Sequence, residues 1–223
     1  MNYIISVINP DGLPIMTDIC DKLTLPMTLV VRGRGTATQN MLDLLGIESN
    51  DRRVVLTVAG EEKTKALLKE QRRQLYIGVP GRGIVITIPI KSIGGGKTVA
   101  FLNPDEKASY TPTWDPNFEL ILAIANEGTT DLVMNAARSA GATGGTVLHG
   151  KGTGSRNAEK FYNVSIANEK EIVLIVAKRE QKAAIMRAIL KDAGPASQAG
   201  TITFSLPVSA VAGIGNYAEE NEE

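Results

Sequence analysis

The chain contains two copies of one pattern of apolar residues and glycines. Four segments of the first copy match four of the second at a shift of 117 or 118 residues: 3–9 with 120–126, 30–36 with 147–153, 54–59 with 172–177, and 84–90 with 202–208. Self-similarity at a nearly fixed offset is typical of a duplicated structural unit. We therefore expect two related domains in one chain.

The matched segments set the expected domain bounds. We expect a first copy over residues 1–95, a linker over 96–118, a second copy over 119–216 and an acidic tail over 217–223. The linker contains Pro104, Pro112 and Pro116. Proline fixes φ and lacks a backbone donor, so this stretch is expected to be extended.

Each copy has the pattern strand, helix, strand, strand, helix, strand. In the second copy, Thr129 is placed to cap the first helix, and Gly141 to follow its end. The apolar residues of that helix recur at helical spacing: Leu132, Val133, Ala136, Ala137 and Ala140. Two such βαβ units in a row predict an α+β fold with two tandem ferredoxin-like domains. The strands are apolar for most of their length, so we expect the sheet faces without helices to pack on other copies.

Composition excludes several classes of protein. Lys plus Arg number 24 and Asp plus Glu number 24, so no net charge favours a phosphate backbone, and aromatic residues are only 4%. We expect no nucleic-acid partner. Cys20 is the only cysteine and His149 the only histidine, so no metal cluster is expected. The sequence shows no signal peptide and no spanning helix, so we expect a cytoplasmic protein without membrane insertion.

The second copy resembles the PII nitrogen-regulatory signalling family, in a branch with short loops. The resemblance rests on residues 120–154, 158–162, 169–175 and 203–208, and the first copy shares it most clearly at residues 79–85. It implies ferredoxin-like domains that assemble as compact trimers. It also implies binding of ATP, ADP or AMP as a regulatory ligand, with no covalent cofactor, and no covalent chemistry.

The resemblance implies a signal-transduction protein of the nitrogen-utilisation type. Such a protein binds a nucleotide or another small anionic metabolite between domains and modulates an unidentified partner protein. Three tandem chains would close two rings, so a homo-oligomer is expected. The alternative is a structural or oligomeric binding module that kept the fold and lost the nucleotide. It is favoured by the absence of paired arginines after either fourth strand, at 93–96 and 211–215. An enzyme is not expected, because no constellation of His, Cys and carboxylates is present.

Candidate ligand-binding residues lie where glycines flank a basic side chain. Glycine lets backbone approach a ligand closely, and consecutive N–H groups can bind an anion. The alternative is that these glycines only serve tight turns. Two such sequences lie at a strand exit and one lies in the turn before a fourth strand. His149 precedes one of them, as a strand-end or pocket-lining residue. The candidates are Gly33, Arg34, Gly35, Gly81, Arg82, Gly83, His149, Gly150, Lys151, Gly152, Thr153, Gly154 and Arg156.

Overall fold

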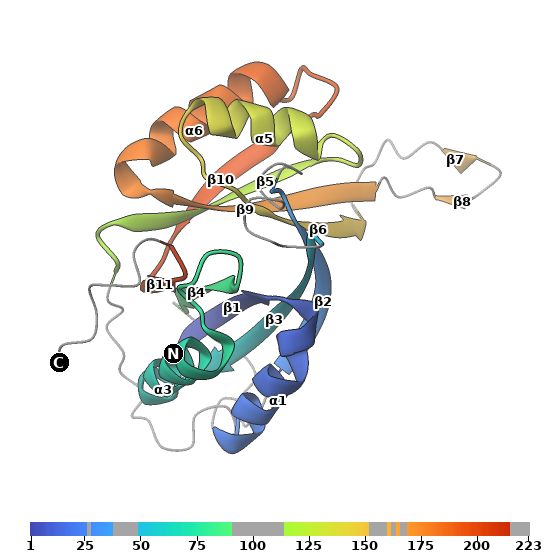
Figure 1. Ribbon diagram of the computed structural model, residues 1–223. Coiled ribbons are helices and arrows are strands. Elements are labelled where there is room, and N and C mark those ends of the chain that lie inside the picture. Colours follow the sequence, from blue (N-terminus) through green and yellow to red (C-terminus); the bar gives the residue numbers. More distant parts are fainter. Residues whose placement is uncertain are drawn as a thin grey trace. The chain divides into compact units, whose positions relative to one another are not determined.

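The computed structural model describes residues 1–25, 28–37, 49–90, 114–151, 160–161, 164–165 and 169–214 (Figure 1). Internal contacts divide the chain into two units. Unit 1 comprises Met1–Arg32, Gln39–Pro116 and Pro207–Glu223, and unit 2 comprises Gly33–Thr38 and Asn117–Leu206. Each unit therefore includes a segment that is distant in sequence from the rest of it.

Unit 1 has the expected βαββαβ order. Its elements are β1 (Asn2–Ile8), the short helix η1 (Pro10–Gly12), α1 (Leu13–Lys22), β2 (Thr28–Gly35), β3 (Asp51–Ala59), α3 (Glu61–Leu75), β4 (Gly83–Pro89) and β11 (Ala210–Ala212). The strands lie in the order β2-β3-β1-β4-β11. β1 is central and antiparallel to both neighbours, with Ile4 opposite Thr57 in β3 and opposite Thr87 in β4.

The core of unit 1 follows from two apolar periods. Ile4 and Ile8 lie four residues apart in β1 and point to the same side, because side chains alternate along a strand. Met16 and Ile19 face them from α1, and Leu67 faces them from α3. Spacings of three and four residues place such side chains on one helical face. Cys20 belongs to this core and is 2% exposed, and burial raises the pKa of its thiol.

Unit 2 repeats the same order. Its elements are β5 (Phe118–Asn126), α5 (Thr130–Ser139), β6 (Thr146–Lys151), β7 (Lys160–Phe161), β8 (Val164–Ser165), β9 (Glu169–Lys178), α6 (Arg179–Ala193) and β10 (Ile202–Pro207). The main strands lie in the order β10-β5-β9-β6, with β5 antiparallel to β9. The tandem ferredoxin-like fold class is thus confirmed. Between β6 and β9 in the sequence lies the separate antiparallel pair of β7 and β8.

A segment of the first copy completes the sheet of unit 2. Gly33–Gly35, the end of β2, pairs antiparallel with β6. Thr36 extends the pairing: its N–H donates to Gly145 O at 3.0 Å, and its Oγ1 accepts from Gly145 N at 2.8 Å. Arg138 of α5 donates to the carbonyl oxygen of Thr36.

A segment of the second copy likewise completes unit 1. β11 pairs antiparallel with β4, and Ser209 N donates to Thr87 O at 2.8 Å. The hydroxyl of Ser209 lies 2.8 Å from that of Thr87 and 3.1 Å from Asn2 Oδ1. The two sequence repeats are therefore not the same as the two structural units.

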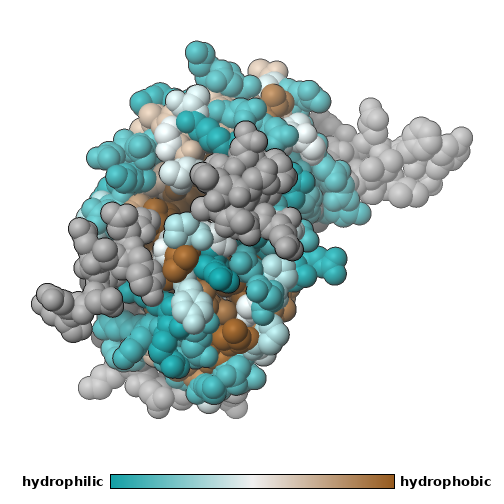
Figure 2. Space-filling model, in the orientation of Figure 1, coloured by the Kyte–Doolittle hydropathy of each residue, from teal (hydrophilic) through white to brown (hydrophobic). Residues whose placement is uncertain are grey.

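Large apolar side chains remain exposed on two strands. Leu29 on β2 is 56% exposed, and Ile202 and Phe204 on β10 are 63% and 40% exposed. On the face drawn in Figure 2, hydrophilic residues cover most of the surface, and hydrophobic residues show as small separate patches. That these strands pack on other copies stays a prediction.

Candidate functional site

Arg82 lies in a glycine-rich turn that the fold of unit 1 requires. Gly81 and Gly83 have φ angles of 81° and 139°, in the region that side chains rarely adopt. A Cβ on Gly83 would lie 2.3 Å from Val7 O. The turn is closed by Arg82 N, which donates to Val79 O at 3.1 Å. The glycines thus serve the backbone, while the exposed Arg82 side chain is left for another role.

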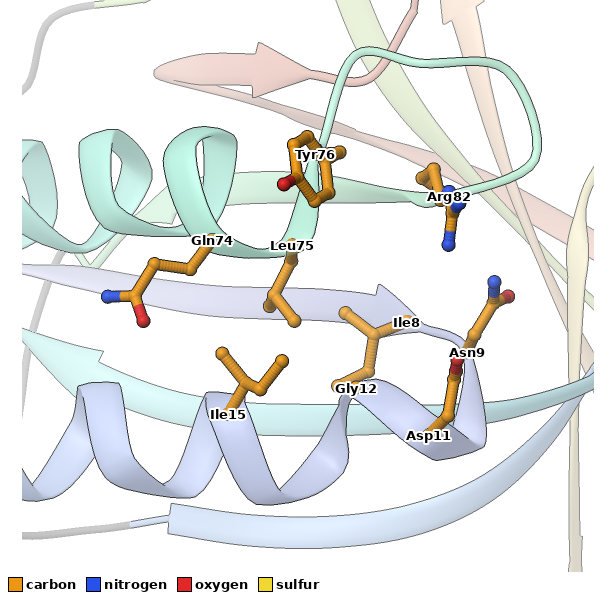
Figure 3. Close-up of a pocket in the computed structure, with 9 residues that line it drawn as sticks. All are labelled: Ile8, Asn9, Asp11, Gly12, Ile15, Gln74, Leu75, Tyr76 and Arg82. Carbon is orange, nitrogen blue, oxygen red and sulfur yellow. The ribbon is translucent and has the colours of Figure 1, made fainter.

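The side chain of Arg82 borders a small pocket of about 120 Å³ in unit 1 (Figure 3). The walls come from the end of β1, from η1 and the start of α1, and from the end of α3. The lining residues are Ile8, Asn9, Asp11, Gly12, Ile15, Gln74, Leu75, Tyr76 and Arg82. Tyr76 has a φ of 56°, which ends α3 and turns the chain beside this pocket. The pocket therefore forms where three chain turns meet.

Asn9 and Arg82 point toward one another across this pocket (Figure 3). Asn9 Oδ1 is buried and accepts no hydrogen bond within the part of the chain that the structure describes. Neither Arg82 nor Asp11 forms an ion pair among the described residues. The pocket is thus bordered by a cation and a carboxylate that form no ion pair with the described residues.

The aligned position in unit 2 is filled by the chain itself. Asn126, the counterpart of Asn9, accepts a hydrogen bond from Lys170 Nζ at 2.5 Å and donates to Gln198 O at 2.9 Å. Glu171 Oε2 accepts from Thr130 N at 3.0 Å and from Thr130 Oγ1 at 2.6 Å. Glu171 therefore satisfies the N-terminus of α5, where a negative charge is favourable.

The predicted side-chain cap of α5 by Thr129 is wrong, because Glu171 bonds the start of this helix instead. Thr129 occupies the N-cap position, but its side chain makes no capping bond and instead donates to Asn126 O at 2.5 Å. Burial acts to raise the pKa of Glu171. Hydrogen bonds from Thr130 and Gly128 and the nearby His149 outweigh it, so the pKa is lowered. The carboxylate is consequently held in its charged form.

The remaining described candidates lie around β6. His149 Nε2 is 3.6 Å from Glu171 Oε1, and its strand-end or pocket-lining role stays a prediction. Lys151 Nζ is 3.2 Å from Glu169 Oε1, and both side chains are largely exposed. Gly33, Arg34 and Gly35 lie opposite Leu148, Val147 and Thr146. Unit 2 thus brings the first-copy sequence close to the strand that carries His149, Gly150 and Lys151.

Gly150 differs from the glycines near Arg82. Its φ is not positive, and a Cβ there would meet nothing within 4 Å. Neither backbone conformation nor packing requires glycine at this position, so the alternative of a turn requirement does not explain it. Gly152, Thr153, Gly154 and Arg156 lie outside the described residues.

The comparison with protein families identifies the second copy. Residues 118–216 match the model of the family "Nitrogen regulatory protein P-II". This part of the chain is a PII-like domain. The match begins at β5 and extends through β11, the strand that belongs to unit 1.

Solved structures of PII proteins align with less than half of the chain. Arabidopsis thaliana PII bound to citrate is 25% identical, with 43% of this chain and 78% of that chain covered and a TM-score of 0.32. The B. subtilis GlnK–ATP complex is 13% identical, with 44% and 95% covered and a TM-score of 0.34. No curated protein matches the chain.

The described residues limit which other types of site are available. They contain no group of three or more His, Cys, Asp or Glu side chains placed to hold a metal ion. None of the helices among them has the length and apolarity needed to cross a membrane.

Sequence reasoning found Arg82 but missed its neighbours. Asn9, Asp11 and Gly12 belong to an Asn-Pro-Asp-Gly sequence, which is typical of a turn between a strand and a helix. The only available signal was the alignment of Asn9 with Asn126, a polar residue kept at a strand end in both copies. Glu171 was missed because its partner, Thr130, is 41 residues away.

Proposed function

We propose that this chain is a PII-like regulatory protein that binds a nucleotide or another small anionic metabolite and changes the activity of a partner protein. The observation that carries the proposal is the match of residues 118–216 to the nitrogen regulatory protein P-II model. The protein acts by binding and carries out no covalent chemistry. Nitrogen utilisation is the pathway that the family description suggests.

We assign anion binding to the basic residues with glycine neighbours. Arg34 and Arg82 are exposed and have no ion-pair partner among the described residues. The ion pair of Lys151 with Glu169 is exposed, and such pairs contribute only about 0–1 kcal/mol. An anionic ligand can therefore recruit these cations at little structural cost.

The ligand proposal is tested by thermal unfolding of the full chain with ATP, ADP, AMP, 2-oxoglutarate and citrate. A ligand at 100 times its Kd stabilises a protein by about 2.7 kcal/mol. We expect at least one of these anions to raise the melting temperature, and Lys151→Ala or Arg82→Ala to reduce that shift. No shift with any ligand contradicts anion binding and leaves the structural module as the better proposal.

The assembly proposal is a trimer of tandem chains. Static light scattering measures the mass directly, and three times 23.8 kDa is expected. A monomeric mass contradicts the trimer without affecting the ligand test.

A further inference from the structure

We infer that β10 of unit 2 is a docking edge for a second copy of this chain, and that the second copy covers it with its own β11. The inference rests on the homo-oligomer of the proposed function, and it adds the two strands through which one chain meets the next. Both strands lie within the described residues.

Three of the four edge strands in the two units already have a covering strand. The edges of the four-stranded cores are β2 and β4 in unit 1 and β6 and β10 in unit 2. β2 and β6 pair with one another through Gly33–Gly35, and β11 pairs antiparallel with β4. β10 alone has no strand on its outer side in the part of the chain that the structure describes.

The uncovered edge carries large apolar side chains on one face. Ile202 and Phe204 are 63% and 40% exposed and lie two residues apart, so both project from the same side of β10. The residue aligned with Phe204 in unit 1 is Ile86, which lies opposite Val211 of β11 and is 1% exposed. The aligned position is therefore buried on the strand that has a covering strand, and exposed on the strand that has none.

The sequence of β10 does not protect its edge from pairing. Natural proteins protect such edges with charged side chains, proline or bulges, because unpaired N–H and C=O groups bind other strands. Residues 202–207 contain no charged residue. Pro207 is aligned with Pro89 of β4, and β11 pairs with β4 despite that proline. The sequence of β10 thus allows a strand to be added.

The covering strand is β11 because it is the other terminal strand of the two main sheets. Among the described strands it has β4 on one side only, and β4 is the strand aligned with β10. Within the chain the described pairings join β11 to β4 and not to β10, so the covering β11 belongs to a second copy.

A contact of β11 with β10 is head-to-tail. Each chain gives one strand and receives one, and such a heterologous contact closes a ring when the rotation between neighbours allows it. A ring of three chains agrees with the proposed trimer. Pairing of β10 with β10 of another chain would instead join chains only in twos.

The first test is the mass of the full chain by sedimentation velocity over a dilution series. Phe204→Lys places a charge on the edge, as in protected edge strands. Phe204 is exposed, so the variant is expected to fold, which circular dichroism checks. We expect it to dissociate at a protein concentration at least tenfold higher than the wild type does. Leu190→Lys is the matched control, because Leu190 is 46% exposed and lies on α6, and it should leave the dissociation unchanged.

The second test joins the two strands covalently. Phe204→Cys and Val211→Cys are combined in a Cys20→Ala background, since Ala137 is the residue aligned with Cys20. Oxidation is expected to give covalent oligomers on a non-reducing gel, and Phe204→Cys alone is expected to give none. Dimers from Phe204→Cys alone would mean that β10 pairs with β10, and would overturn the inference. A double variant that stays at the mass of one chain also overturns it, since β10 is then covered from within the chain or not at all.

The outcomes are separate from those of the proposed function. An oligomer whose dissociation Phe204→Lys leaves unchanged overturns only this inference. A monomeric wild type overturns both this inference and the proposed trimer. Ligand binding is measured independently, by thermal unfolding with nucleotides and small anions, so the regulatory proposal stands or fails by that result.

Discussion

The two units build the same fold with different polar pairs at aligned positions. In unit 1, Asn2 Nδ2 donates to Thr64 Oγ1 at 3.4 Å, and Gln71 Nε2 donates to Ser6 Oγ at 3.0 Å. At the positions aligned with Asn2 and Thr64, unit 2 has an ion pair, with Lys182 Nζ 2.8 Å from Glu119 Oε2. The apolar periods alone therefore set the shared topology, and the polar positions are free to differ.

The same contrast holds at the strand end that carries the candidate site. In unit 2, Lys170 donates a hydrogen bond to Asn126, and Glu171 accepts one from the N-terminus of α5. Unit 1 has Arg53 where unit 2 has Glu171, and Asn9 is left without a bond on its Oδ1. At this strand end the polar groups of unit 2 are bonded within the unit, whereas Asn9 Oδ1 of unit 1 has no partner among the described residues.

The largest expected effect tests whether the turn before the fourth strand is interchangeable between the units. Gly83→Ala places a Cβ against Val7 O at a φ of 139°, so we expect unit 1 to lose about 3 kcal/mol or more of unfolding free energy. The aligned residue in unit 2 is Thr201, whose φ is not positive and whose buried Oγ1 has no partner in the described structure.

Thr201→Ala is therefore the control, and we expect it to change stability by less than about 1 kcal/mol. Hydrogen exchange of β1 and β4 amides measures unit 1, and that of β5 amides measures unit 2. Equal losses in the two variants would show that the turns are equivalent after all.

Glu171→Gln tests whether unit 2 is stabilised by its own carboxylate. The pKa of Glu171 is lowered in the folded protein. Its stabilisation is therefore fully present above the ordinary glutamate pKa and is lost as pH falls through the lowered, folded value. We expect the variant to lose about 1–2 kcal/mol at neutral pH and to lack this part of the acid sensitivity.

Unfolding of both proteins by urea between pH 3 and pH 7 measures the difference. The expected result is two stability curves that converge at low pH. Parallel curves would mean that the pKa of Glu171 is not lowered in the folded protein. The charge of Glu171 would then not explain why unit 2 differs from unit 1, which has Arg53 at the aligned position.

Unit 2 has the buried apolar residues Ala123 and Ile189 at the positions aligned with Ser6 and Gln71. Ser6→Ala together with Gln71→Ile transfers this apolar pair into unit 1. Ser6→Ala alone removes the acceptor of Gln71 Nε2 in a fully buried place, and is expected to cost about 1 kcal/mol. The double variant also removes Gln71 Oε1, which is buried without a partner in the described structure, and is expected to regain that cost. Chemical denaturation of both single variants and the double variant gives the coupling energy. A double variant that is less stable than either single one would show that unit 1 depends on this polar pair.

The sequence predicted what is local and missed what depends on tertiary contacts. Apolar periods and Gly141, which has a φ of 101° just past α5, were sufficient for the βαββαβ order. The exchange of Gly33–Gly35 and β11 between the repeats was not predicted, since pairing partners of short strands leave no periodic signal. Arg82 was found because glycines flank it. The roles of Asn9 and Glu171 were not predicted. Their sequence positions are typical of a turn and a strand, and only contacts with residues distant in sequence distinguish them from other polar residues there.

The smallest expected effect separates a ligand-binding role of Lys151 from a structural one. Its ion pair with Glu169 is exposed and screened by salt, so Lys151→Ala should change the unfolding free energy by less than about 0.5 kcal/mol. By contrast, Lys170→Ala should cost more, because it leaves Asn126 Oδ1 without its donor. Urea unfolding at 0.05 M and 0.5 M NaCl measures both variants. A loss of 1 kcal/mol or more for Lys151→Ala would make this lysine part of the scaffold, and would leave Arg34 as the exposed basic candidate of unit 2 for an anion to recruit.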